Sequence, residues 1–178
     1  MKQLTAPPSY GTMRSKRQPK ALKPVQAMHE TPTPQEDAAR QDQQLDSWSK
    51  QVGDTRARVA MEQLRKTKRL GATLPELLAE AWLTSRGDDY RTQVDIGFSK
   101  PDIVRMGVEG GCHVWRIQGD YWHNRPGVPS SDEQKKQQML GTTIYGQPVM
   151  AVIDIWESRI YQGDEVFEQA MLKQEVVP

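Results

Sequence analysis

The apolar residues of this chain change their spacing close to Gly87, and that change restricts the fold that the chain can adopt. Before Gly87 they recur at the spacing of amphipathic helices. After it, short segments rich in β-branched and aromatic residues are separated by glycine and proline, which is typical of strands. Helical spacing returns near the C-terminus. We therefore expect an α/β domain in which a mixed sheet carries helices on its faces.

Two matching motifs mark the starts of predicted helices. The segments TPQE at residues 33–36 and TLPE at residues 73–76 each combine a threonine N-cap, a proline in the first turn and a glutamate three residues after the cap. The first motif predicts a long helix within residues 33–71, which Gly53 weakens. The second predicts a helix that ends near residues 86–89.

The predicted strands cover residues 90–96, 102–108, 112–118 and 148–155. Two glycines separate the second strand from the third, so this pair is expected to form a hairpin. Helices are also predicted at residues 131–140 and 164–173. The expected order of elements is α-β-β-β-α-β-α.

The net charge of +1 hides a strong asymmetry along the chain. Residues 1–70 hold 14 Lys or Arg and 7 Asp or Glu, net +7, whereas the remainder is net −6. Residues 1–32 are rich in proline and basic residues with few apolar ones, so we expect a disordered basic arm. A helical appendage (33–71) and a globular domain (72–178) follow it. The arm is expected to contact DNA phosphates or to dock on the acidic body.

Several classes of protein are excluded by what the chain contains. No apolar run is long enough for a membrane helix, and the N-terminus lacks the apolar block of a secretory signal. Cys112 is the only cysteine, which rules out an internal disulfide and a zinc site built on paired thiolates. We expect a soluble protein of the cytoplasm, or of the host cell or virion if a phage encodes it.

Polar residues at the ends of two predicted strands form a candidate site. Asp102 begins one strand and Gln118 ends the next, and Gln118 shares a face with Arg116 because alternate residues point the same way. Glu76, in the first turn of a helix, could approach the same edge. Such oxygen ligands suit Mg²⁺, and His123 would titrate near neutrality. The plainer roles are a turn residue for Asp102, a helix cap for Glu76 and a surface histidine for His123.

Three segments carry a resemblance to a known family: TLPELLAEAWLTSRGDDYRTQVDIGFSKPDIV, HVWRIQGDYWHN and VMAVIDIWESRI. Together they resemble the very-short-patch repair endonucleases, which belong to the PD-(D/E)XK, or restriction-endonuclease-like, nucleases. The resemblance covers roughly residues 73–161. It implies an αβββαβ core with a mixed sheet, DNA as the substrate and Mg²⁺ as the cofactor.

The resemblance also assigns roles to individual residues. It makes Asp102 the central Mg²⁺ ligand and the main-chain carbonyl near Ile117 a second ligand. Glu76 would be an outer-shell acid, and His123 a general acid/base or a phosphate contact. Tyr121 and Trp122 would be the aromatic residues that insert into the duplex beside a mismatch.

The chain departs from the family pattern at the second metal ligand. Many of these nucleases end the strand with Glu-x-Lys, where this chain has Arg116, Ile117 and Gln118. Asp120 could replace the missing ligand. Arg116 could hold a phosphate, or it could neutralise Asp102 and abolish metal binding. The structural zinc of the repair enzymes is not expected, because this chain lacks the cysteines for it.

The leading hypothesis is a Mg²⁺-dependent DNA endonuclease or nickase. Phosphate contacts are expected from the basic segment Arg65, Lys66, Lys68 and Arg69. The alternative is a catalytically degenerate nuclease fold that serves a structural or interaction role in a phage particle or other large assembly. In that case residues 33–71 would bind a partner protein or a second copy. A third possibility is DNA binding without cleavage.

Overall fold

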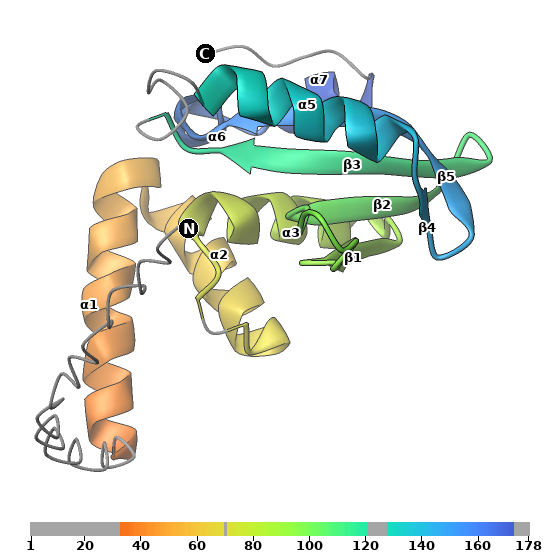
Figure 1. Ribbon diagram of the computed structural model, residues 1–178. Coiled ribbons are helices and arrows are strands. Elements are labelled where there is room, and N and C mark those ends of the chain that lie inside the picture. Colours follow the sequence, from red (N-terminus) through yellow and green to blue (C-terminus); the bar gives the residue numbers. More distant parts are fainter. Residues whose placement is uncertain (1–32, 70, 121–127, 173–178) are drawn as a thin grey trace, which may run out of the picture.

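The computed structural model describes residues 33–69, 71–120 and 128–172 (Figure 1). The predictions for the basic arm (1–32) and for Tyr121, Trp122 and His123 concern residues outside these ranges.

Local capping fixes where the first helices begin. In α1 (Pro34–Val52), Thr33 accepts a hydrogen bond from Glu36 N at 3.3 Å, and Thr33 N donates to Glu36 Oε2 at 2.8 Å. The predicted single long helix is instead two helices. Gly53, with φ 80° and ψ 158°, separates α1 from α2 (Asp54–Thr67) because that backbone conformation lies outside the helical region.

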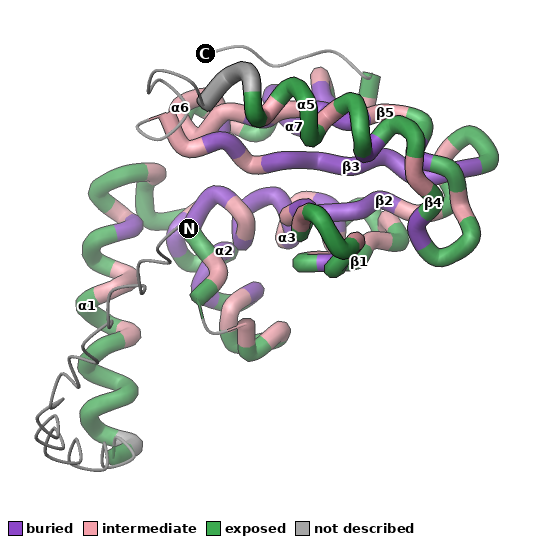
Figure 2. Tube along the Cα trace, in the orientation of Figure 1, coloured by how far each residue is buried: buried purple, intermediate pink, exposed green. Residues whose placement is uncertain are grey.

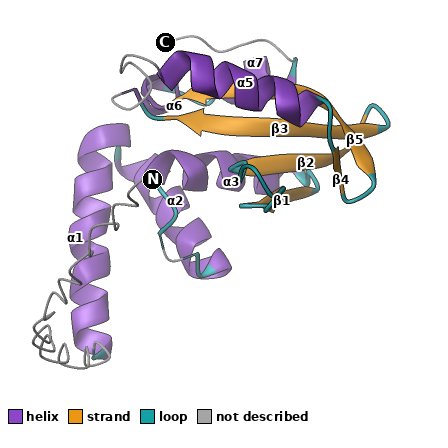
Figure 3. Ribbon diagram, viewed as in Figure 1, coloured by secondary structure: helices purple, strands orange, loops and turns teal. Residues whose placement is uncertain are grey.

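The helix α3 (Leu74–Arg86) leads into a five-stranded sheet with the order β1-β2-β3-β5-β4 (Figure 3). The strands β1, β2 and β3 form an antiparallel meander, and β3 pairs in parallel with β5. The helix α5 (Val128–Leu140) lies between β3 and β5 in the chain. The bounds of the strands are β1 Tyr90–Thr92, β2 Ile103–Val108, β3 Gly111–Gln118, β4 Thr143–Ile144 and β5 Gln147–Trp156.

The expected mixed sheet and the expected order of elements are both confirmed, with two additions. The short strand β4 forms a hairpin with β5, and the helix α6 (Glu157–Gln162) precedes α7 (Glu165–Met171). The strand β1 is shorter than predicted. It ends before Gln93, which has φ 51°, a left-handed conformation that interrupts an extended strand.

The two faces of the sheet bury different sets of apolar residues, as the alternation along β3 predicts. Trp115 packs with Ile103 and with the helices α2, α3, α6 and α7 on one face, where it stacks on Phe167 at a ring distance of 6.2 Å. Val114 packs with Met139 of α5 on the other face. Figure 2 shows that β3 is buried along most of its length.

The helices before the sheet share the core of the globular domain. Trp48 of α1 and Met61 of α2 belong to the same apolar cluster as Leu77 and Trp115. The other end of α1 projects from the body, and its surface is mostly exposed (Figures 1 and 2). The boundary predicted at residues 71 and 72 thus lies within a continuous core. No helix in the described part of the chain is long and apolar enough to cross a membrane.

Candidate active site

Asp102 lies just before β2, and its side chain contacts the end of β3 and the residue that follows β1. Its Oδ2 accepts a hydrogen bond from the main-chain N–H of Ile117 at 2.7 Å, and its Oδ1 accepts one from Gln93 Nε2 at 3.4 Å. The antiparallel register pairs Ile103 with Trp115, so the next pair would be Asp102 and Arg116. The side chain of Asp102 therefore bonds to the main chain one residue beyond its own register position.

The environment of Asp102 disfavours its negative charge. Burial raises the pKa of Asp102 to about 6, and the nearby charge of Glu76 adds to the rise. The Ile117 N–H and the charge of Arg69 act in the opposite direction but do not cancel it. Among the described residues, no Lys, Arg or His forms an ion pair with Asp102. A bound cation would therefore stabilise the ionised carboxylate.

Arg116 forms its ion pair with Asp154 of β5. Arg116 Nε and Nη2 each lie 2.6 Å from Asp154 Oδ1, and Arg116 Nη1 donates to the carbonyl of Asp132 at 3.0 Å. Parallel pairing places Asp154 directly beside Arg116 in the sheet. The suggestion that Arg116 neutralises Asp102 is not what the structure shows. Asp154 instead keeps the guanidinium in place.

Gln118 belongs to the same buried polar group. Its Nε2 donates to Asp154 Oδ1 at 2.6 Å, and Lys136 Nζ of α5 lies 3.6 Å from Asp154 Oδ2. Burial alone would raise the pKa of Asp154, but the hydrogen bonds and charges of Arg116, Gln118 and Lys136 hold that pKa below its usual value. Asp154 is thus a stable anion that orients two residues of the candidate site.

The residues predicted from the two strand ends meet in one polar pocket of about 170 Å³. Asp102, Arg116, Ile117 and Gln118 all line it, as expected from the sequence. The pocket also contains residues that the sequence analysis did not select. The described residues that line it are Ser99, Lys100, Pro101, Asp102, Arg116, Ile117, Gln118, Asp132, Lys135 and Met139. A signal for Asp154 was present in the sequence, because it is the single charged residue within the apolar run 148–155.

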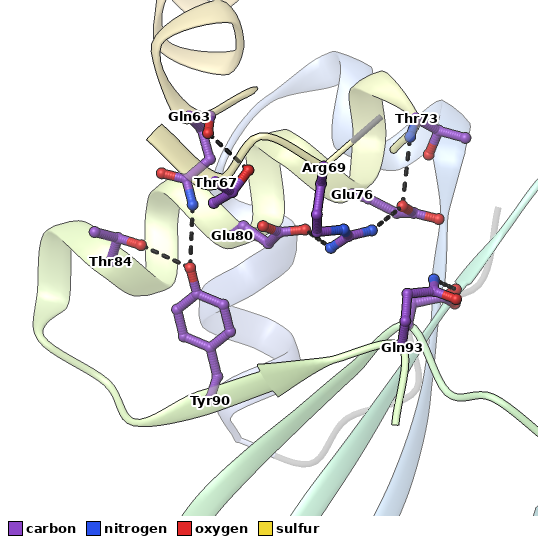
Figure 4. A network of polar contacts seen from close by, with 10 residues as sticks. Gln63, Thr67, Arg69, Thr73, Glu76, Glu80, Thr84, Tyr90 and Gln93 are labelled. Atoms are coloured by element: carbon purple, nitrogen blue, oxygen red, sulfur yellow. Dashed lines mark hydrogen bonds and ion pairs between the residues drawn. The ribbon is translucent and has the colours of Figure 1, made fainter. Parts of the chain in front are cut away.

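Glu76 is close enough for its charge to affect Asp102, but its carboxylate is held by Arg69. Arg69 Nη2 lies 2.7 Å from Glu76 Oε2, and Arg69 Nη1 pairs with Glu80 (Figure 4). Glu76 Oε2 also accepts a hydrogen bond from Thr73 N at 3.4 Å, which is its capping role. Arg69 was predicted to contact DNA. Two carboxylates already bind it, and its side chain is 20% exposed.

Asp120 caps the start of α6. Its Oδ2 accepts a hydrogen bond from Ser158 N at 3.0 Å, and its Oδ1 accepts one from Ser158 Oγ at 3.1 Å. Both carboxylate oxygens therefore have a structural role, although Asp120 was considered as a substitute metal ligand.

The rest of the predicted basic segment is exposed at the end of α2. Arg65, Lys66 and Lys68 all have exposed side chains. Arg65 Nε also donates to Gln41 Oε1 of α1 at 3.1 Å, which connects the two helices. A groove of about 580 Å³ runs between α1 and α2 beside Arg65 and Lys68. This surface can accept an anionic partner.

The oxygen ligands around Asp102 are compatible with a single hard cation. Mg²⁺ commonly uses one or two protein carboxylates and keeps several waters, so it does not require a dense acidic cluster. The described residues contain no group of three or more His, Cys, Asp or Glu that could hold a metal ion. The donors considered are the carboxylate of Asp102 and the main-chain oxygen of Ile117, and both of these residues line the pocket.

Comparisons of the chain with models of protein families, with curated proteins and with solved structures found no match.

Proposed function

We propose that this chain is a Mg²⁺-dependent DNA endonuclease or nickase with a restriction-endonuclease-like core. The observation that carries the proposal is the position of Asp102. Its carboxylate is desolvated, meets the main chain of Ile117 at the end of the neighbouring strand, and has no ion-pair partner among the described residues. The order α3-β1-β2-β3-α5-β5, with the short strand β4 inserted before β5, supports the proposal, because the family resemblance implies an αβββαβ core.

In this proposal, Asp102 and the carbonyl of Ile117 hold the cation. A bound Mg²⁺ would polarise a phosphodiester and lower the pKa of a water. Lys100 and Lys135, which line the same pocket, would bind the phosphate of the substrate. His123 remains the predicted acid or base. It lies outside the described residues.

The contacts of Asp154 with Arg116 and Gln118 would leave Asp102 available to bind a cation. By forming the ion pair with Arg116, Asp154 prevents that guanidinium from neutralising Asp102. It also fixes the amide of Gln118, whose carbonyl oxygen can then accept a hydrogen bond from a water or a substrate.

The proposal is tested with purified protein and supercoiled or mismatch-containing DNA, with Mg²⁺, with Mn²⁺ or with EDTA. We expect nicked product only with a divalent metal, and Asp102→Asn should abolish it while leaving DNA binding intact. Asp46→Asn is a matched control, because Asp46 is an exposed carboxylate on α1. Metal-dependent nicking by Asp102→Asn at the rate of the unchanged protein would contradict the assignment.

A second candidate function is a nuclease fold without catalysis that acts as a structural or interaction protein of a phage particle or other large assembly. Two observations favour it. Arg116 stands where a second acidic ligand is expected, and α1 projects a largely exposed half from the body (Figure 2). Two results together would support this function over the first. Neither metal would give a cleavage product, and sedimentation would show a mass that increases with protein concentration. Deletion of residues 1–44 would remove that increase.

A further inference from the structure

Gln93 lies directly opposite Asp102, at the point where β1 ends. The antiparallel register of β1 and β2 pairs Thr92 with Ile103, so Gln93 and Asp102 form the next pair. The main-chain N–H of Gln93 donates to the carbonyl of Asp102 at 3.2 Å, and Gln93 Nε2 donates to Asp102 Oδ1 at 3.4 Å (Figure 4). Gln93 therefore contacts both the main chain and the carboxylate of Asp102.

The backbone of Gln93 has a conformation that glutamine seldom adopts. Its φ of 51° lies in the left-handed region, where a Cβ crowds the backbone and glycine or asparagine is preferred. The same loop between β1 and β2 has a glycine, Gly97, where φ is 89°. Glycine at position 93 would satisfy the backbone equally well. The glutamine side chain is therefore better explained by its contact with Asp102 than by the turn of the chain.

The amide of Gln93 complements the other contact of the Asp102 carboxylate. The main-chain N–H of Ile117 in β3 binds Oδ2 at 2.7 Å, whereas Gln93 binds Oδ1 from the end of β1. Two donors from different strands thus fix the orientation of the carboxylate. An ionised carboxylate has about four lone-pair sites, so both oxygens can still bind a cation. A group that orients a metal ligand in this way typically changes metal affinity by about 10–100-fold.

We propose that Gln93 is a positioning residue, which holds the carboxylate of Asp102 in the orientation that binds a divalent cation. This inference rests on the proposed function. Gln93 is not among the described residues that line the candidate active-site pocket, so it acts through Asp102. Its side chain is exposed and its hydrogen bond is long, so the contact should contribute little to folding. Loss of the amide should therefore weaken cation binding more than it lowers stability.

The experiment compares the full chain with Gln93→Asn at pH 7.5. Asparagine adopts the left-handed conformation more readily, but its side chain is one methylene shorter, so its amide should no longer reach Asp102 Oδ1. Mn²⁺ binding is measured from the electron paramagnetic resonance signal of the free ion, and folding stability by urea unfolding. We expect the dissociation constant for Mn²⁺ to rise by about tenfold or more, with the urea midpoint unchanged or higher. Nicking of supercoiled DNA at limiting Mn²⁺ should fall by a similar factor.

Two further variants separate the side chain from the backbone. Gln93→Gly removes the amide but allows the same backbone, so it should weaken Mn²⁺ binding as Gln93→Asn does. Glu109→Asn is the matched control. Glu109 also has a φ of 51° and is exposed, but it lies in the turn between β2 and β3. This control should change stability in the same direction as Gln93→Asn and leave Mn²⁺ binding and nicking unchanged.

Two results would overturn the proposal. One is a dissociation constant for Mn²⁺ in both Gln93 variants that stays within about twofold of the value for the unchanged protein, well below the effect expected of a group that orients a metal ligand. The other is an equal loss of binding in Glu109→Asn, because the effect would then not be specific to the neighbour of Asp102.

The outcomes also separate this inference from the proposed function. Weaker Mn²⁺ binding by the Gln93 variants, with no nicking by any of the proteins, would retain the positioning role and remove the nuclease. Metal-dependent nicking that both Gln93 variants retain in full would do the reverse. No Mn²⁺ binding by the unchanged protein would overturn both.

Discussion

The carboxylate of Asp102 accepts a hydrogen bond from the main-chain N–H of Ile117 at 2.7 Å. One side chain thereby connects the start of β2 with the end of β3, and its carboxylate is largely removed from solvent. The stability of the fold and the proposed chemistry both depend on this contact, so it is the first feature to test.

Folding stability should depend on pH through Asp102. Because folding raises the pKa of Asp102 from 3.8 to about 6, the folded protein binds this proton more tightly than the unfolded chain. The resulting stabilisation is fully present below pH 4 and is lost as the pH rises through about 6. At about 1.4 kcal/mol per pKa unit, its size is on the order of 3 kcal/mol.

The measurement is urea unfolding of the unchanged protein and of Asp102→Asn at pH 4 and pH 7.5. Asparagine can still accept the Ile117 hydrogen bond but does not ionise, so the difference in unfolding free energy should shift in favour of the variant at the higher pH. Asp46→Asn should show no such shift. A constant difference across this pH range would refute the prediction.

Mg²⁺ should stabilise the protein against heat at pH 7.5, where Asp102 is ionised. A ligand that binds only the folded state raises its stability with increasing ligand concentration. We expect Tm to rise with the logarithm of the Mg²⁺ concentration in the unchanged protein and to rise much less in Asp102→Asn. Scanning calorimetry in NaCl of matched ionic strength measures this effect. Equal increases in both proteins would show that the ion binds elsewhere.

Removing the charge of Asp154 should destabilise the fold strongly. Asp154→Asn leaves the buried Arg116 without its carboxylate, and breaking a buried pair in this way typically costs about 3–5 kcal/mol. The double variant Arg116→Met/Asp154→Leu should recover most of that loss. Urea unfolding measures both.

The ion pair of Arg56 and Asp164 provides the comparison, because its carboxylate side chain, Asp164, is 56% exposed. Asp164→Asn should cost about 1 kcal/mol or less. If Asp154→Asn lowered the free energy of unfolding by as little as Asp164→Asn does, the pair of Arg116 and Asp154 would have no special structural role.

The basic end of α2 should contribute phosphate contacts that do not depend on DNA sequence. Replacing Arg65 or Lys66 with alanine should weaken DNA binding for all sequences alike, and each change should reduce the salt dependence of the affinity by about one counterion. Fluorescence anisotropy at several salt concentrations measures the slope. Lys50→Ala, a change on α1 in a side chain that is 74% exposed, is the control. If this control lowers the slope as much as the α2 variants, the contact is not localised at α2.

Much of the secondary structure follows from the sequence by itself because its causes are local. The hydrogen bonds between Thr33 and Glu36 span three residues, so the TPQE motif is sufficient to mark the start of α1. The alternation along β3 likewise assigns Val114 and Trp115 to opposite faces before any partner strand is known. The positions of Asp102 and Gln118 at strand ends follow in the same way.

The tertiary structure decided which charges meet. Arg116 and Asp154 are 38 residues apart, and only the parallel pairing of β3 with β5 brings them together. That pairing determines that Arg116 binds Asp154, so Asp102 has no ion-pair partner within the described part of the chain. The pocket that Asp102, Arg116 and Gln118 line together is decided in the same way. A residue pattern fixes local conformation, whereas ion pairs and cavities depend on the packing of segments that are distant in the chain.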